Sequence, residues 1–152
     1  MKNIQKLIFA SFIFVHCSQL SAEEDRICNE IRNFASSASK DKPVSITLRT
    51  NWADFGKACI HNKQSSEENF CKWLVSNTSM EFMQLNVNRV VSCLIREKSN
   101  ILDSELDYTN ATGEFSVYEV PGIDVDIVLT VSYSFGKEDE LPKLTIVAEF
   151  ES

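Results

Sequence analysis

The residue types best suited to chemistry in this chain are cysteine and histidine. Beyond residue 22 the chain has one histidine, His61, and four cysteines, Cys28, Cys59, Cys71 and Cys93. A Ser-His-Asp or Cys-His catalytic site would therefore have to use His61. Cys59 lies close to it in sequence, but export favours an oxidised cysteine. We interpret His61 as a solvated loop residue, and we expect no catalytic residues.

The cysteines predict a disulfide framework. Their even number in an exported domain indicates two bonds, for which three pairings are possible. Spacing alone does not settle the connectivity, but we favour Cys59–Cys71, which would tie the second predicted helix to the third, together with Cys28–Cys93. Zinc is the competing use of four cysteines, but the chain has no Cys-x-x-Cys pair. The sequence also lacks a complete calcium loop and a glycine-rich phosphate loop, so we predict neither a metal nor a cofactor.

Carboxylates are the other group that could do chemistry. Alternation within predicted strands places seven of them on one outer face of a sheet, together with Thr130 and Ser132: Asp103, Glu105, Asp107, Asp124, Asp126, Glu149 and Glu151. Paired carboxylates can cleave glycosides, but a general acid needs a buried environment and these should be solvated. Like charges across strands destabilise a sheet, so we interpret the array as a surface for a basic partner. The alternative is a solvated face that keeps the protein soluble and protects the sheet from edge pairing.

The N-terminus predicts export. Lys2 and Lys6 precede a short apolar run that is too short to cross a bilayer, and small residues follow it. We place cleavage after Ala22, which leaves one domain at residues 23–152. Cys17 could suggest lipid attachment, but His16 stands where a lipoprotein signal has a small residue. The compartment is then periplasmic or extracellular. In a eukaryotic secretory pathway, Asn77 and Asn110 begin sequons that could be glycosylated.

Charge narrows the class of partner. Without Lys2 and Lys6 the chain has 13 basic and 22 acidic residues, a formal net charge of −9. Nucleic acid needs a basic surface, so we exclude it as a partner. No second apolar stretch is long enough for a membrane helix. An acidic protein suits a basic partner, or no partner at all. The oligomeric state is left open.

The first half of the domain has mostly helical periodicity. The spacing predicts helices over residues 24–38, 51–59, 65–77 and 79–94, with one short strand over 44–49. Ser65 and Glu68 have the spacing of a capping box. Trp52 and Phe55 fall on one face of the predicted second helix, so we expect them in the core.

The second half changes to a period of two. It predicts strands over residues 102–108, 114–120, 125–135 and 144–150. Four successive strands with short turns favour an antiparallel meander. The fold class is therefore α+β: three to four helices packed on one face of a four-stranded C-terminal meander, with one additional short strand near residues 44–49.

These features favour an exported, non-catalytic binding protein that engages a basic protein through an acidic sheet face. An inhibitor, or an immunity protein against an exported toxin, fits the size, export, disulfides and acidity. One alternative is a small-ligand carrier or an enzyme with a pocket between helices and sheet. Another is a structural subunit of a cell-envelope assembly.

Overall fold

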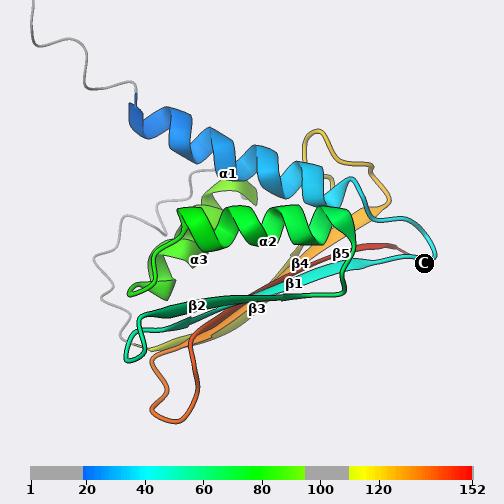
Figure 1. Cartoon of the computed structure of the whole chain (residues 1–152). Coiled ribbons are helices and arrows are strands. Elements are labelled where there is room, and N and C mark those ends of the chain that lie inside the picture. Colours follow the sequence, from blue (N-terminus) through cyan, green and yellow to red (C-terminus); the bar gives the residue numbers. More distant parts are fainter. Residues whose placement is uncertain (1–18, 95–109, 152) are drawn as a thin grey trace, which may run out of the picture.

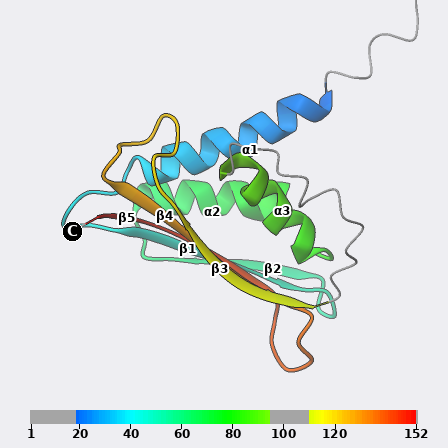
Figure 2. The same cartoon turned by 180° about the vertical axis from the view of Figure 1, so that it is seen from behind.

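The computed structural model describes residues 19–94 and 110–151 as two layers, three helices over one antiparallel sheet. Figures 1 and 2 show the helices together on one side of the sheet. The elements in chain order are α1 (Gln19–Ala35), β1 (Val44–Asn51), β2 (Gly56–His61), α2 (Ser65–Asn77), α3 (Met83–Leu94), β3 (Ala111–Val117), β4 (Ile127–Phe135) and β5 (Lys143–Phe150). The predicted α+β class is confirmed.

The sheet has five strands in the order β2-β1-β5-β4-β3, and every neighbouring pair is antiparallel. The C-terminal strands β3, β4 and β5 form a meander, as predicted. The predicted strand over 102–108 lies outside the described residues. The predicted short strand over 44–49 is β1, which lies between β2 and β5 and pairs Ile46 with Ile146. The period-two pattern found β1, but pairing between distant segments leaves no local signal in the sequence.

The predicted helix over residues 51–59 is wrong. Those residues form the end of β1, a turn and most of β2. Asn51 closes the turn, because its Nδ2 donates to Oδ2 of Asp54 at 2.6 Å and its Oδ1 accepts the Asp54 N–H at 3.3 Å. Phe55 then takes a positive φ of 49°, and Gly56 pairs with Asn51. Local turn chemistry thus makes a β-hairpin where apolar spacing suggested a helix.

The core lies between the two layers. Alternate residues of the central strands, such as Leu48 and Ile146, are buried against the helices, and α1 and α2 contribute Phe34 and Phe70. The rings of Phe34 and Phe70 lie 5.0 Å apart between centroids. Burial of this apolar surface is the main force that holds helices on sheet.

Two disulfides join the layers and the helices. Cys28 of α1 pairs with Cys93 of α3, with Cα atoms 5.2 Å apart. Cys59 of β2 pairs with Cys71 of α2, with Cα atoms 5.4 Å apart. This is the predicted pairing, although Cys59 belongs to a strand and not to a helix. Two disulfides indicate an oxidising location outside the cytosol.

A buried carboxylate, Glu67, holds the base of the hairpin to α2. Its side chain is 0% exposed and accepts three backbone N–H groups, from Ser45 at 2.9 Å, Asn62 at 2.7 Å and Gln64 at 3.2 Å. Gln64 is the N-cap of α2 and Glu67 completes the capping box, so the predicted box at Ser65 and Glu68 is wrong by one residue. The three N–H donors compensate the burial of this charge.

Candidate functional site

The structure does not place the seven predicted carboxylates together on a sheet face. Asp103, Glu105 and Asp107 lie outside the described residues. Asp124 and Asp126 lie in the connection before β4, which begins at Ile127, so their placement on a strand is wrong. Val125 between them is 70% exposed, and the Asp124 carboxylate accepts the Asp126 N–H at 3.1 Å. The alternation that predicted a strand here therefore extends into a turn.

The outer face of the sheet carries mainly hydroxyl groups. Thr47 of β1 contacts Thr145 of β5 at 2.9 Å between hydroxyl oxygens, and Ser116 contacts Thr130 at 3.0 Å. Thr130 and Ser132 lie on this face, as predicted. Among the carboxylates of the described strands, only Glu114 and Glu149 lie on it. The sheet face is therefore polar but not an acidic array.

The remaining predicted carboxylates gather at one end of the sheet. The Glu151 N–H donates to the Asp126 carbonyl at 2.8 Å, so the C-terminal end of β5 lies beside the β3–β4 connection. Glu149 lies near the end of β5, two residues before Glu151. Both are exposed, as are Asp124 and Asp126. We name this end, made by residues 118–126 and 149–151, the far end.

The opposite end of the sheet carries an exposed aromatic pair, Trp52 and Phe55. They lie in the tip of the β1–β2 hairpin, with 52% and 69% of their surfaces exposed and ring centroids 5.1 Å apart. The prediction that they belong to the core is wrong, because the segment is a turn and not an amphipathic helix. Exposed aromatics in contact with each other are unusual on a soluble surface and mark interaction sites.

Two further loops reach the same end. The Thr50 N–H donates to the Pro142 carbonyl at 3.1 Å, which brings in the β4–β5 loop. Lys57 Nζ donates to the Thr78 carbonyl at 2.7 Å, which brings in the α2–α3 connection. The larger apolar side chains that these segments and the start of α3 expose are Phe82, Leu85 and Leu141. We name this end, made by residues 50–57, 78–85 and 136–142, the hairpin end.

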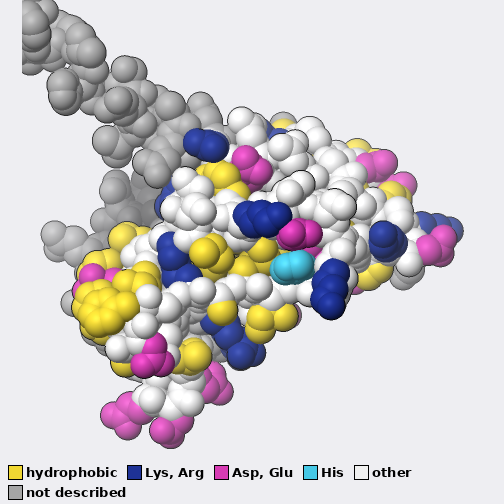
Figure 3. All heavy atoms as spheres, in the orientation of Figure 1, with side chains coloured by type: hydrophobic (Ala, Val, Ile, Leu, Met, Phe, Trp, Pro, Cys, Tyr) yellow, Lys and Arg dark blue, Asp and Glu magenta, His cyan; other side chains and the backbone are white. Residues whose placement is uncertain are grey.

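Acidic side chains are interspersed with these apolar groups. The exposed carboxylates of the hairpin end are Asp54, Glu81, Glu138, Asp139 and Glu140. Figure 3 shows a hydrophobic patch at the lower left with acidic side chains beside and below it. Lys137 pairs with Glu140 at 3.6 Å. An aromatic centre with a charged rim is the usual anatomy of a protein-binding surface.

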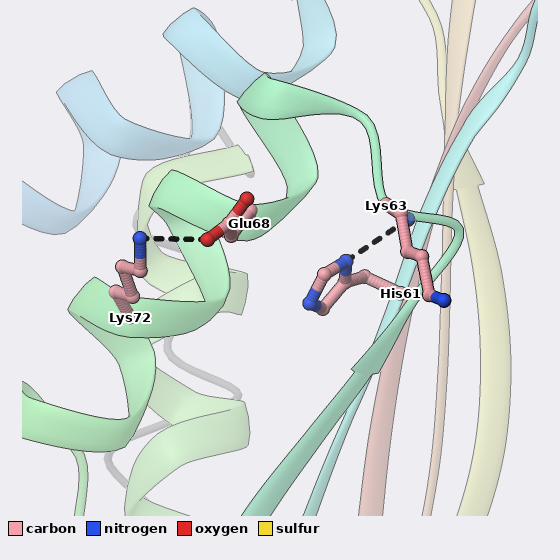
Figure 4. A network of polar contacts seen from close by, with 4 residues as sticks. All are labelled: His61, Lys63, Glu68 and Lys72. Atoms are coloured by element: carbon pink, nitrogen blue, oxygen red, sulfur yellow. Dashed lines mark hydrogen bonds and ion pairs between the residues drawn. The ribbon is translucent and has the colours of Figure 1, made fainter.

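The single histidine beyond residue 22, His61, ends β2 and does not lie in a loop as predicted. Its Nδ1 accepts the Lys63 N–H at 3.0 Å (Figure 4), so neutral His61 carries its proton on Nε2. The neighbouring Cys59 is held in a disulfide and cannot act as a thiolate nucleophile. His61 instead lines a groove between β2 and α2.

Other site types can be stated for the described residues alone. Residues 19–94 and 110–151 contain no group of three His, Cys, Asp or Glu side chains placed to hold a metal ion. Within the same ranges, no helix is both long and apolar enough to cross a membrane. Searches of protein-family models, of curated proteins and of solved structures find no match to this chain.

Sequence reasoning missed the hairpin end, although a signal for it was present. A period-two run over residues 44–51 and a short apolar run over residues 58–60 flank the segment Trp52-Ala53-Asp54-Phe55-Gly56. Asn51 and Asp54 have side chains that favour turns, and Gly56 closes the segment, which is typical of a turn. Taken together, these features would have predicted a hairpin with its aromatics at the tip.

Proposed function

We propose that this chain is an exported, non-catalytic binding protein that engages a basic protein through its hairpin end. The observation that carries the proposal is the exposed, mutually packed pair Trp52 and Phe55. Large aromatic side chains supply most of the binding energy when a partner buries them. The proposal keeps the predicted class of partner and moves the contact from the sheet face to one end of the sheet.

The surrounding charge supports a basic partner. Asp54 lies within the hairpin tip, Glu81 precedes α3, and residues 138–140 are three consecutive carboxylates. The formal net charge of the whole chain, −7, adds a long-range attraction for a positively charged partner. Complementary charge speeds encounter and selects partners, while the apolar centre provides the affinity.

The packing of the interior favours a surface function over an internal pocket. The side chains between the layers are closely buried: Phe34 is 1% exposed and Leu74, Leu129 and Ile146 are 0% exposed. A carrier or an enzyme with its site between helices and sheet needs a cavity in that region. The burial of these core residues supports a site on the surface over a site between the layers.

The test is affinity capture from extracellular or envelope extract with the oxidised protein. Wild type is compared with Trp52→Ser/Phe55→Ser and with a matched control, Tyr118→Ser/Val125→Ser. The control removes comparably exposed side chains, 56% and 70%, from the far end. We expect a basic protein on the wild type and the control, and its affinity should fall about 100-fold or more on the hairpin variant.

Mass spectrometry of the captured fraction identifies the partner, and titration with the purified partner gives the affinities. Equal capture by the hairpin variant and the wild type would refute the hairpin end as the contact surface. Capture of only acidic or neutral proteins would refute the class of partner.

A further inference from the structure

Among the described strands, β2 forms one edge of the sheet. In the sheet order β2-β1-β5-β4-β3, no described strand lies on its outer side. Proteins usually protect such an edge with charges, proline or a covering segment. The two outer-face side chains in the middle of β2 are Ala58 and Ile60, both exposed, with Ile60 at 50%. Lys57, the one lysine of the strand, is directed to the Thr78 carbonyl.

A groove runs beside this edge on the helix side of the sheet. It lies between β2 and α2, has a volume of about 380 Å³, and is lined by Cys59, His61, Glu68, Cys71, Lys72, Val75 and Ser76. The Cys59–Cys71 disulfide and Val75 provide an apolar floor. Figure 3 shows this hydrophobic strip between basic and acidic side chains, with the histidine at one end. A strand added beside β2 would direct alternate side chains into this groove.

The charges around the groove differ from those of the whole chain. Glu68 is paired with Lys72 at 2.7 Å, and this hydrogen bond and the charge of Lys72 hold the pKa of Glu68 below its ordinary value. His61 lies across the groove from this pair (Figure 4). Lys63 lies beyond His61 with its ammonium group directed away from the pair, and Lys57 lies at the other end of β2. The groove itself is lined by one lysine and one carboxylate, which are paired with each other. Lys57 and Lys63, at the two ends of β2, add two positive charges to its rim, on a chain whose formal net charge is −7.

We propose that this groove takes an extended acidic peptide segment of a partner protein, which pairs with β2 as an additional strand. Backbone hydrogen bonds to β2 would give affinity, and the groove would select the side chains that enter it. The positive rim favours carboxylates at those positions. A second copy of β2 fits poorly, because β2 carries no carboxylate to face the lysines around the groove. Lys57 belongs to the hairpin end, but the residues that line the groove do not, so the proposal does not depend on the function of that end.

The first test uses a displayed library of random peptides with the length of β2, six residues, flanked by a serine linker. The full chain, secreted and oxidised, is the bait. We expect enriched peptides to be rich in Asp and Glu and to contain no proline. Two variants probe the groove: Ser76→Trp fills it, and Lys72→Glu reverses its charge. Each should weaken the binding of an enriched synthetic peptide about tenfold or more, as measured by fluorescence anisotropy.

The matched control is Asn69→Trp, which places the same side chain on the α1-facing side of α2, beside Asn33 and Phe70. It should leave peptide affinity unchanged. Ser76, Lys72 and Asn69 are exposed, so the substitutions should preserve the fold, which circular dichroism checks. If Ser76→Trp does not fold, Lys72→Glu is tested instead. Exchanging a glutamate of the peptide for lysine should then restore the affinity that Lys72→Glu removes.

The second test is hydrogen exchange with and without the enriched peptide. Pairing as a strand predicts slower amide exchange within residues 56–61, whereas a contact with the helix surface alone would not protect these amides. The proposal fails if no peptide is enriched, if enriched peptides are not acidic, or if β2 gains no protection. Sedimentation that shows a dimer, abolished by Ser76→Trp, would assign the groove to a second copy and overturn it as well.

Discussion

The two ends of the sheet look alike in charge and differ in apolar exposure. The far end gathers Asp124, Asp126, Glu149 and Glu151, and the hairpin end has five exposed carboxylates of its own. Only the hairpin end adds a packed aromatic pair, Trp52 and Phe55. A solvated carboxylate needs no partner, whereas an exposed Trp or Phe keeps apolar surface in water at a cost in free energy. The apolar exposure is therefore the more informative signal.

The far end also exposes Tyr118 and Val125, but their chemistry differs. Tyrosine keeps its hydroxyl in water, and valine is small. Single exposed apolar residues are ordinary on protein surfaces. At the hairpin end, several such groups occur within three segments that are held together by backbone and side-chain hydrogen bonds.

Removal of the disulfides should separate stability from binding. The Cys28–Cys93 bond spans 65 residues and the Cys59–Cys71 bond spans 12. Replacing each pair with serine should lower the free energy of unfolding by about 4 and about 3 kcal/mol, respectively, because the longer loop restrains the unfolded chain more. Urea unfolding with linear extrapolation measures both.

The order of the two variants should be reversed for partner affinity: the variant that loses less stability should lose more affinity. Cys59→Ser/Cys71→Ser releases β2 from α2 and loosens the hairpin end, so it should weaken binding. Cys28→Ser/Cys93→Ser leaves that end attached and should bind as wild type does. Equal affinity of the two folded variants would mean that the hairpin end needs no such restraint.

Substitution of Glu67 should show that the base of the hairpin depends on a buried charge. Glu67→Gln replaces one acceptor oxygen with an NH₂ group that faces N–H donors, so the free energy of unfolding should fall by about 2 kcal/mol. Its neighbour Glu68 is the matched control, because it is exposed and makes one surface ion pair. Glu68→Gln should leave the urea midpoint unchanged. A shift of equal size in both variants would assign the effect to helix charge in general.

Neutralising carboxylates at each end tests whether charge location matters. Asp54→Asn/Glu81→Gln should weaken partner binding about threefold, and added salt should reduce the difference between variant and wild type. Asp124→Asn/Asp126→Asn removes the same charge from the far end. Surface plasmon resonance at low and moderate salt compares their association rates. A larger loss from the far-end variant would return the contact to the originally predicted carboxylates.

Lys57 should give the smallest effect, a pH dependence of stability. Burial lowers the pKa of Lys57 in the folded state from 10.5, the value expected in the unfolded chain. Between the two pKa values the unfolded chain binds more protons, so stability relative to Lys57→Met should rise as the pH increases toward 10.5. Urea midpoints of both proteins across this alkaline window measure it. A fall instead of a rise would mean that the hydrogen bond to Thr78 outweighs burial.

Local sequence patterns predicted most of the described helices and strands correctly and failed for the segment after β1. The apolar alternation of Val44, Ile46 and Leu48 predicted β1, and helical spacing predicted α1, α2 and α3. The segment after β1 failed because Trp52, Phe55 and Cys59 have helical spacing by coincidence, while the bonds between Asn51 and Asp54 decide a turn. An alternating pattern marks a strand only where the backbone pairs with a neighbour. The alternation here begins before Ile127, in a connection outside β4, and it therefore misled the placement of Asp124 and Asp126.

The sequence by itself determined the class of this protein: an α+β chain with a net negative charge and, beyond residue 22, four cysteines suited to disulfides and one histidine. These are properties of composition and short-range period. Only the tertiary structure decided that β1 lies inside the sheet, that β2 forms one edge of the described sheet, and that Lys57 of β2 reaches the α2–α3 connection. Each of these depends on contacts between residues far apart in the chain, and such contacts are selected by packing of the whole core and not by local propensity.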